Sequence, residues 1–193
     1  MTEDEILSEF RSVEALLEGH FLLSSGRHSA YYLQCARLLM NPERAGRIAL
    51  AITQKIPREV RSEVEVVISP AMGGIIIGHE MARALGVDAL FVERPDGVFG
   101  LRRGFSLAPG TKVLLIEDVV TTGLSSREAI AAIESAGGIV IAAGAVVDRS
   151  AGTAELGVPF FPLIQLNFPT YAPDELPPEL ATSQAVKPGS RKL

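Results

Sequence analysis

From residue 64 to residue 166, short apolar runs alternate with segments whose apolar residues recur every three or four positions. The apolar runs, rich in Val, Ile and Leu, predict buried strands, and the periodic segments between them predict helices. The predicted strands cover residues 64–69, 88–93, 112–117, 139–148 and 160–166, the last of which is expected to be the final strand of the chain. The predicted helices cover residues 73–86 and 125–138. This alternation indicates an α/β fold in which helices flank a mostly parallel central sheet.

The N-terminal part of the chain shows a different pattern. Thr2 and Glu5 have the spacing of a capping box, so we expect a helix to begin there. Apolar residues continue at helical spacing, and Gly19 suits the C-terminal end of that helix. Two apolar runs around a Ser-Gly turn predict a β-hairpin over residues 20–35, and an Asn-Pro pair predicts a helix over residues 42–56.

Composition and charge narrow the class of protein. A length of 193 residues with 47% apolar residues suits a globular protein, and we expect a single domain over residues 1–193. The net charge of -5 argues against general nucleic-acid binding, and no apolar run is long enough to cross a membrane. The acidic, amphipathic start does not read as a signal peptide, and the single cysteine, Cys35, excludes an intramolecular disulfide. A cytoplasmic protein is therefore expected.

Two segments do not fit the alternation of strands and helices. Residues 94–110 join two predicted strands through a long connection rich in Gly, Pro and charge, and such connections in compact domains are often functional. Residues 171–193 are polar and rich in proline, so we expect an irregular tail on the surface.

The most informative stretch is VLLIEDVVTTGLSS, residues 113–126. Two adjacent acids, Glu117 and Asp118, follow its apolar run, at the end of a strand where ligands of open parallel sheets bind. Ionised carboxylates only accept hydrogen bonds, so the pair suits hydroxyl groups such as those of a ribose. The alternative interpretation is that Asp118 and the threonines after it only cap a helix.

The turn after the two acids has the features of an anion site. It leads into a predicted helix, whose first backbone N–H groups and positive dipole end attract a phosphate. It also offers three hydroxyls and a glycine, from Thr121, Thr122, Ser125 and Gly123. A 5-phosphorylated ribose would satisfy the acids and the turn at once. The chain contains no G-x-x-x-x-G-K-[ST] loop and no Rossmann fingerprint, which excludes those two nucleotide-binding motifs.

Within this stretch, VLLIEDVVTTGLS (residues 113–125) resembles the phosphoribosyl pyrophosphate (PRPP) motif of type I phosphoribosyltransferases. Other segments resemble the orotate phosphoribosyltransferases within that family. Their N-terminal segment is similar to HFLLSSGRHSAYYLQ, their pyrophosphate loop and next helix are similar to SPAMGGIIIGHEMARALG, and their mobile loop is similar to FVERPDGVFGLRRGF. The strand end that carries their orotate-contacting arginine is similar to AVVDRSAG, and their C-terminus is similar to VKPGSRKL. The resemblance runs from about Glu18 to the end of the chain. It implies the type I phosphoribosyltransferase fold, with a small N-terminal hood over residues 1–40 and a mobile loop over residues 94–110.

The resemblance also implies a reaction and its residues. PRPP and orotate would give orotidine 5′-monophosphate and pyrophosphate, with Mg²⁺ bound mainly through substrate oxygens and no firm protein ligand. The residues implied to bind PRPP are Glu117, Asp118, Val119, Val120, Thr121, Thr122, Gly123, Leu124, Ser125, Arg94, Ala71, Met72 and Gly73. Those implied to bind orotate are Thr121, Arg149, Tyr31 and Tyr32, and those implied to act in catalysis are Asp118, Arg102 and Arg103. A non-proline cis peptide bond in the pyrophosphate loop is a further expectation.

The chain departs from one branch of this family at several places. That branch has lysines where this chain has Ser24 and Gly73, and its mobile loop carries lysine and histidine, which residues 94–110 lack. Arg102 and Arg103 are the candidates for those roles, in a loop that acts across the interface of a homodimer in relatives. Two alternatives stay open: a phosphoribosyltransferase for a purine or another base, and a PRPP-sensing regulator without catalysis.

Overall fold

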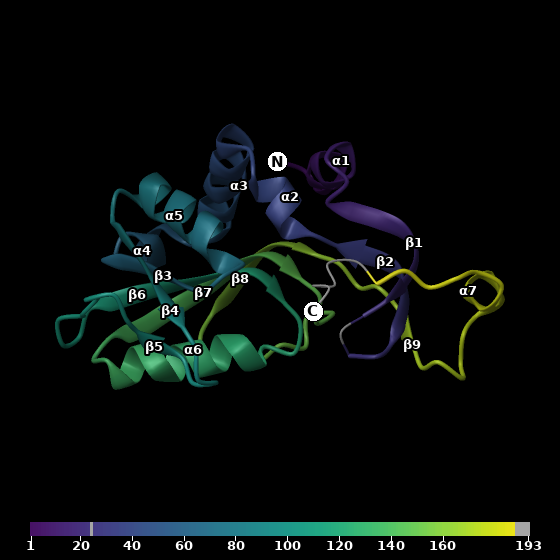
Figure 1. The fold of residues 1–193 in the computed structure, drawn as a ribbon. Coiled ribbons are helices and arrows are strands. Elements are labelled where there is room, and N and C mark those ends of the chain that lie inside the picture. The colour runs from purple at the N-terminus through teal and green to yellow at the C-terminus, as the bar shows by residue number, and fades with distance from the viewer. Residues whose placement is uncertain (24, 188–193) are drawn as a thin grey trace. The chain divides into compact units, whose positions relative to one another are not determined.

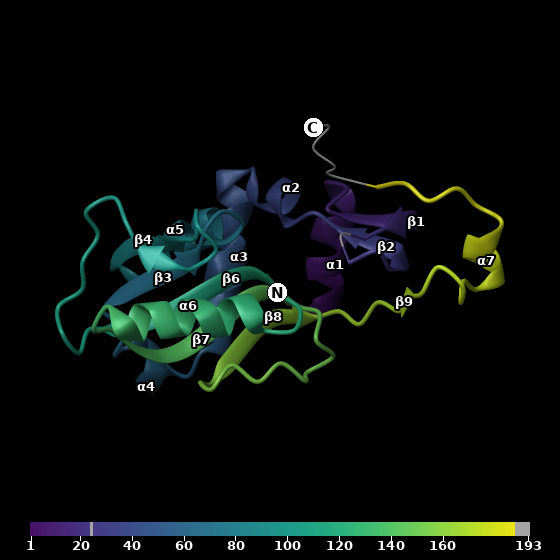
Figure 2. The ribbon, with the colours of Figure 1, turned by 60° about the horizontal axis from the view of Figure 1, so that its bottom comes forward.

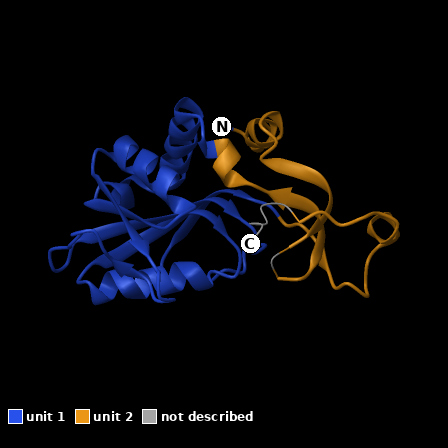
Figure 3. Cartoon of the chain, viewed as in Figure 1, with its two compact units in different colours: residues 1, 39–166 blue, residues 2–38, 167–193 orange. Residues whose placement is uncertain are grey.

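The computed structural model describes residues 1–23 and 25–187, which form two compact units (Figure 3). The first unit contains Met1 and Leu39–Leu166, and the second contains Thr2–Leu38 and the described part of Asn167–Leu193. Ser24 and most of the VKPGSRKL segment lie outside the described residues. The single domain with a hood over residues 1–40 stays a prediction.

The described residues of the first unit form a six-stranded sheet in the order β5-β4-β3-β6-β7-β8 (Figure 1). Its strands are β3 (Val66–Pro70), β4 (Asp88–Glu93), β5 (Gly100–Leu101), β6 (Lys112–Val120), β7 (Ile139–Asp148) and β8 (Phe160–Gln165). Neighbouring strands of this sheet pair in parallel, except that β5 pairs with β4 in antiparallel. The chain order changes direction at β3, because β4 lies on one side of it and β6 on the other. The carboxyl ends of β3 and β6 therefore flank a topological switch point, where ligands of such sheets bind.

Helices cover both faces of this sheet (Figure 1, Figure 2). One face carries α3 (Pro42–Lys55) and α5 (Gly74–Leu85), which pack against each other and against the strands, and the short α4 (Arg58–Arg61) follows α3. The other face carries α6 (Leu124–Ser135), whose buried Ile130 and Ile133 share a core with Val113 and Leu115 of β6. The central strands are apolar on both faces because both faces are covered. The predicted α/β fold class with a mostly parallel sheet is confirmed.

The described residues of the second unit include a three-stranded antiparallel sheet in the order β1-β2-β9. Its elements are α1 (Glu3–Ser12), β1 (Leu16–Leu22), β2 (His28–Leu33), most of α2 (Cys35–Leu39), β9 (Thr170–Tyr171) and α7 (Pro178–Ala181). The segment after α7 returns to β1, where Val186 N donates to His20 O at 2.8 Å and Leu22 N donates to Val186 O at 2.9 Å. Backbone hydrogen bonds therefore order part of the tail on this unit.

The structure corrects the predicted N-terminal helix, which was expected to reach Gly19. Helix α1 ends at Ser12, because Glu14 takes a left-handed φ of 52° that a helix cannot continue. Leu16–Leu22 then forms a strand that pairs with β2. Two further predictions were wrong: the run at 160–166 is not the final strand, since β9 follows it, and the tail expected to be irregular contains α7.

Candidate active site

The turn between β6 and α6 lies at the switch point of the sheet. A hollow of about 200 Å³ is lined by Glu117 and by the residues of the turn and the helix start, Val119, Val120, Thr121, Thr122, Gly123, Leu124, Ser125 and Ser126. Gly123 has a left-handed φ of 73°, and a Cβ at this position would lie 2.7 Å from Leu156 Cδ2, so the turn requires glycine. The structure thus gathers in one hollow the contiguous residues that the sequence predicts for a phosphate.

Glu117 is buried beneath this turn, with 7% of its surface exposed, and its Oε1 accepts a hydrogen bond from Ser126 Oγ at 3.1 Å. The pKa of Glu117 is raised to about 8, mainly by burial and next by the negative charge of Asp118, against the lowering effects of Ser126 and Arg94. The surroundings of Glu117 therefore favour the protonated form of this carboxyl. A ligand that donates hydroxyl hydrogen bonds, or a nearby cation, would favour its ionised form.

Asp118 lies against the loop that joins β3 to α5. Burial raises the pKa of Asp118, and the hydrogen bond that Val119 N donates to its Oδ1 at 2.9 Å lowers it. A Cβ on Gly73 would lie 2.7 Å from Asp118 Cγ, so the backbone of this loop closely approaches the carboxylate. The peptide bond between Ala71 and Met72 in the same loop is cis, as the resemblance implied.

Arg94, the first residue after β4, reaches the turn. Its Nη2 donates to Ser125 Oγ at 3.3 Å, and its Nη1 donates to Glu128 Oε2 at 2.7 Å. Its positive charge also lowers the pKa of Glu117, against the larger effect of burial. The structure therefore brings this predicted PRPP-binding arginine to the hollow.

Arg102 and Arg103 lie further along the loop over residues 94–110 and contact acids there. Arg103 pairs through Nε and Nη2 with both carboxylate oxygens of Glu93, at 3.0 and 3.1 Å. Arg102 Nη2 donates to Asp96 Oδ2 at 3.3 Å. Both arginines thus offset negative charges of β4 and of the loop itself in this structure, and their catalytic role stays a prediction.

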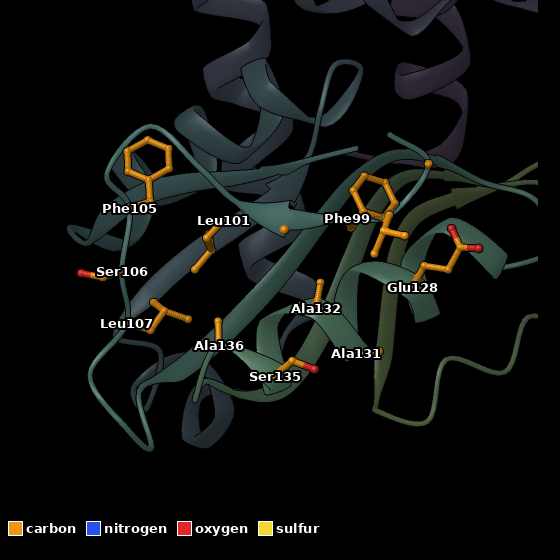
Figure 4. A pocket seen from close by; sticks show the side chains of 13 residues that line it. Phe99, Leu101, Phe105, Ser106, Leu107, Glu128, Ala131, Ala132, Ser135 and Ala136 are labelled. Atoms are coloured by element: carbon orange, nitrogen blue, oxygen red, sulfur yellow. The ribbon is translucent and has the colours of Figure 1, made fainter. Parts of the chain in front are cut away.

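A larger hollow, of about 740 Å³, lies between this loop and α6 (Figure 4). Its lining is mostly apolar, from the loop residues Val98, Phe99, Leu101, Phe105 and Leu107 and from alanines of α6. Figure 4 shows Phe99 and Glu128 at one end of it and Leu101, Phe105 and Leu107 at the other. The smaller hollow is the candidate site for chemistry, because it combines a carboxyl group, hydroxyls and a helix start.

The residues predicted to contact orotate are divided between the two units. They are Thr121 and Arg149 in the first unit, and Tyr31 and Tyr32 in the second. Arg149 directly follows β7, and its backbone N–H donates to Val120 O at 2.8 Å, which places it beside the turn after β6. In the second unit, the ring of Tyr31 stacks on Phe168 with centroids 4.6 Å apart.

Known proteins are similar to this chain in both sequence and fold. Residues 36–161 match the phosphoribosyl transferase domain family. The orotate phosphoribosyltransferase of Novosphingobium aromaticivorans is 75% identical over 191 residues, which cover 99% of this chain and 98% of the relative. The chain belongs to the orotate phosphoribosyltransferase family. The resemblance seen in the sequence is thereby confirmed.

Solved structures of this family have the same fold. The orotate phosphoribosyltransferase of Aeropyrum pernix has a TM-score of 0.68 at 25% identity, and the match covers 83% of this chain and 93% of that chain. That of Mycobacterium tuberculosis H37Rv, solved in complex with inorganic phosphate, has a TM-score of 0.66 at 26% identity, with 84% and 94% covered. The type I phosphoribosyltransferase fold is therefore the fold of this family member.

Three residues at the start of α6 contact the site of this family member, although sequence reasoning did not select them. They are Ser126, Arg127 and Glu128. Ser126 and Glu128 hold the buried acid and the loop arginine described above. Arg127 Nη1 donates to the backbone oxygens of Thr122 at 3.1 Å and Glu155 at 3.0 Å, which anchors the turn. Their only signal in the sequence is their position immediately after the PRPP motif.

The donor set of the site suits a metal held through substrate. No group of three or more His, Cys, Asp or Glu side chains in residues 1–23 and 25–187 could hold a metal ion. Glu117 and Asp118 offer carboxylate oxygens, and Mg²⁺ commonly binds one or two carboxylates together with substrate phosphates. Separately, none of the helices in this part of the chain is long and apolar enough to cross a membrane.

Proposed function

We propose that this chain transfers the phosphoribosyl group of PRPP to orotate, giving orotidine 5′-monophosphate and pyrophosphate. The observation that carries the proposal is the hollow at the switch point, where the buried Glu117 and the partly buried Asp118 precede a hydroxyl-rich turn at the start of α6. The relatives and solved structures described above are named for this activity. The enzyme is a glycosyltransferase of pyrimidine nucleotide synthesis.

The turn before α6 binds the 5-phosphate of PRPP. The first backbone N–H groups of a helix have no intrahelical partners, and the helix dipole is positive at this end. The hydroxyls of Thr121, Thr122 and Ser125 add hydrogen-bond donors, and Arg94 adds a positive charge beside Ser125. The Mycobacterium tuberculosis relative, solved with inorganic phosphate, supports an anion site in this fold.

Glu117 and Asp118 bind the two ribose hydroxyls and stabilise the transition state. As the bond between the anomeric carbon and the pyrophosphate oxygen breaks, positive charge builds on the ribose, and nearby carboxylates lower its energy. A ring nitrogen of orotate forms the new bond to the anomeric carbon, and the leaving pyrophosphate takes up the proton that this nitrogen loses. Because burial raises the pKa of Glu117 to about 8, hydrogen bonds from the ribose are needed to favour its carboxylate form at neutral pH.

The leaving pyrophosphate is a polyanion, and the backbone of Ala71, Met72 and Gly73 binds it. Mg²⁺ bound through substrate oxygens supplies further charge neutralisation. Closure of the loop over residues 94–110 brings Arg102 and Arg103 to the leaving group and excludes water, which would hydrolyse the activated ribose. In a cytoplasmic homodimer, Arg102 and Arg103 of this loop serve the partner's site.

Arg149 gives the site its preference for orotate. A guanidinium fork fits a carboxylate or carbonyl on a planar ring, and Thr121 adds a hydroxyl beside it. The resemblance also assigns Tyr31 and Tyr32 to orotate binding, and that assignment stays a prediction. A phosphoribosyltransferase for purines would not need this guanidinium, and a PRPP sensor would bind PRPP without using any base.

The test of this function is the loss of orotate absorbance in the presence of PRPP and Mg²⁺, with adenine, hypoxanthine and uracil as competing bases. We expect turnover of orotate only, and a loss of about 10- to 100-fold in kcat/KM for Arg149→Ala, because a hydrogen bond to a charged group is removed. Arg58→Ala, an exposed arginine on α4, is the control that keeps full activity. Tight PRPP binding without turnover of any base would leave only the regulator, and turnover of a purine would assign the other alternative.

A further inference from the structure

Arg94 lies beside the turn between β6 and α6, which is the proposed phosphate site, and it contacts three side chains there. Its Nη2 contacts Ser125 Oγ at the start of α6 at 3.3 Å, and its Nη1 contacts Glu128 Oε2 at 2.7 Å, one helical turn further along α6. Its guanidinium also lies over the buried ring of Phe99, 4.6 Å from the centroid. These contacts fix a positive charge where the 5-phosphate of PRPP is expected.

The ion pair between Arg94 and Glu128 is exposed and therefore exchangeable. The two side chains are 42% and 41% exposed, and ion pairs at such positions contribute little to stability. A phosphate monoester carries more negative charge than a carboxylate and offers several oxygens to the guanidinium fork. A phosphate bound at Ser125 would therefore compete with Glu128 for the same guanidinium.

We propose that Glu128 is a counter-anion for Arg94: it pairs with the guanidinium until PRPP binds and then releases it to the 5-phosphate. The inference rests on the proposed function, since it takes the turn to be the phosphate site. Glu128 acts through Arg94 and is a positioning residue. It keeps the guanidinium beside Ser125 when no ligand is bound, and it lowers the affinity for the sugar phosphate.

The test is calorimetric titration of the 193-residue chain with ribose 5-phosphate, which carries the phosphate and the ribose hydroxyls but no pyrophosphate. Glu128→Gln is expected to bind it about two- to fivefold more tightly than the wild type, the range set by an exposed ion pair. Glu134→Gln makes the same change at an exposed position further along α6, and it is the matched control whose affinity stays at the wild-type value. Unchanged or weaker binding by Glu128→Gln overturns the proposal.

The same Glu128→Gln substitution in an Arg94→Ala chain separates two effects. Glu128 can compete with the phosphate for Arg94, or its negative charge can simply repel the phosphate. When Arg94 is already alanine, the gain from Glu128→Gln is expected to shrink, because no guanidinium remains to be released. An equal or larger gain in that background would mean that Glu128 acts only through its charge, which also overturns the proposal. A wild type that binds neither ribose 5-phosphate nor PRPP would instead refute the proposed function. If the wild type binds ribose 5-phosphate and Glu128→Gln binds it with the same affinity, only the proposed role of Glu128 is refuted.

Discussion

The burial of Glu117 gives the ligand-free protein a pH dependence that comes from one side chain. Its pKa in the folded chain is raised to about 8 from the ordinary value of 4.5, which applies to the unfolded chain. Because the folded state holds the proton more tightly, the stability that this residue contributes is present near pH 4.5 and is lost as the pH rises to 8. Glu117→Gln carries no charge, so its Tm relative to the wild type is expected to rise across this window.

Thermal unfolding of the two proteins without ligand, near pH 4.5 and above pH 8, checks this expectation. A difference in Tm that is the same at both pH values would contradict the raised pKa of Glu117. Glu134→Gln, at an exposed position, is expected to show no such trend.

The same Glu117→Gln substitution is expected to lower kcat/KM, because an amide is a weaker acceptor for the ribose hydroxyls than a carboxylate. The carboxylate that costs stability above pH 8 is thus the one that is proposed to bind the ribose hydroxyls.

Segments whose boundaries depend on local chemistry were predictable from the sequence. Helix α3 begins after its Asn41 cap, α5 ends at Gly86 in the left-handed conformation, and β7 covers the predicted residues 139–148. The two-residue strands β5 and β9 were not predictable, because their pairing partners define them rather than any periodicity. Leu16 and Leu17 continue the helical spacing of Ile6, Phe10 and Val13. Pairing with β2 nevertheless makes residues 16–22 a strand, which shows tertiary contacts overriding a local pattern.

The candidate site likewise contains residues that were predictable from the sequence and contacts that were not. Residues 117–125 are contiguous, so their chemistry could be read from one stretch of sequence. The partners of Ser126 and Glu128 are Glu117 and Arg94, which lie 9 and 34 positions away along the chain. Such pairs depend on how α6 packs over β6 and on where the loop after β4 returns. The raised pKa of Glu117 has the same origin, since burial is a property of the packed chain.

The loop between β3 and α5 closely approaches β6 at Gly73. Substitution of Gly73 therefore tests whether this close contact positions Asp118. Gly73 has φ and ψ of -60° and -40°, which alanine adopts freely, but an alanine Cβ would collide with the Asp118 carboxylate. Gly73→Ala is therefore expected to displace Asp118 and to lower kcat/KM by about 100-fold, with little change in Tm. Gly100→Ala is the control, because a Cβ at that position meets nothing within 4 Å. Full orotate turnover by Gly73→Ala would remove Asp118 from the reaction.

In the proposed homodimer, the loop arginines divide between two sites. Arg94 contacts Ser125 of its own chain, whereas Arg102 and Arg103 are proposed to serve the partner's site. Mixed dimers separate these roles. A chain with Arg103→Ala, paired with a chain inactivated by Asp118→Asn, is expected to regain orotate turnover, because the intact loop of the second chain reaches the intact acids of the first.

A chain with Arg94→Ala, paired with the same Asp118→Asn chain, is expected to stay inactive. One of its two sites lacks its own Arg94 and the other lacks Asp118, so neither site is complete. Random pairing limits recovery in the Arg103→Ala mixture to about one quarter of wild-type activity, because half of the dimers are mixed and each has one restored site. The measurement is orotate turnover of both mixtures after their molecular mass has established dimers. Recovery in both mixtures would place Arg94 at the partner's site, and recovery in neither would confine every loop arginine to its own chain.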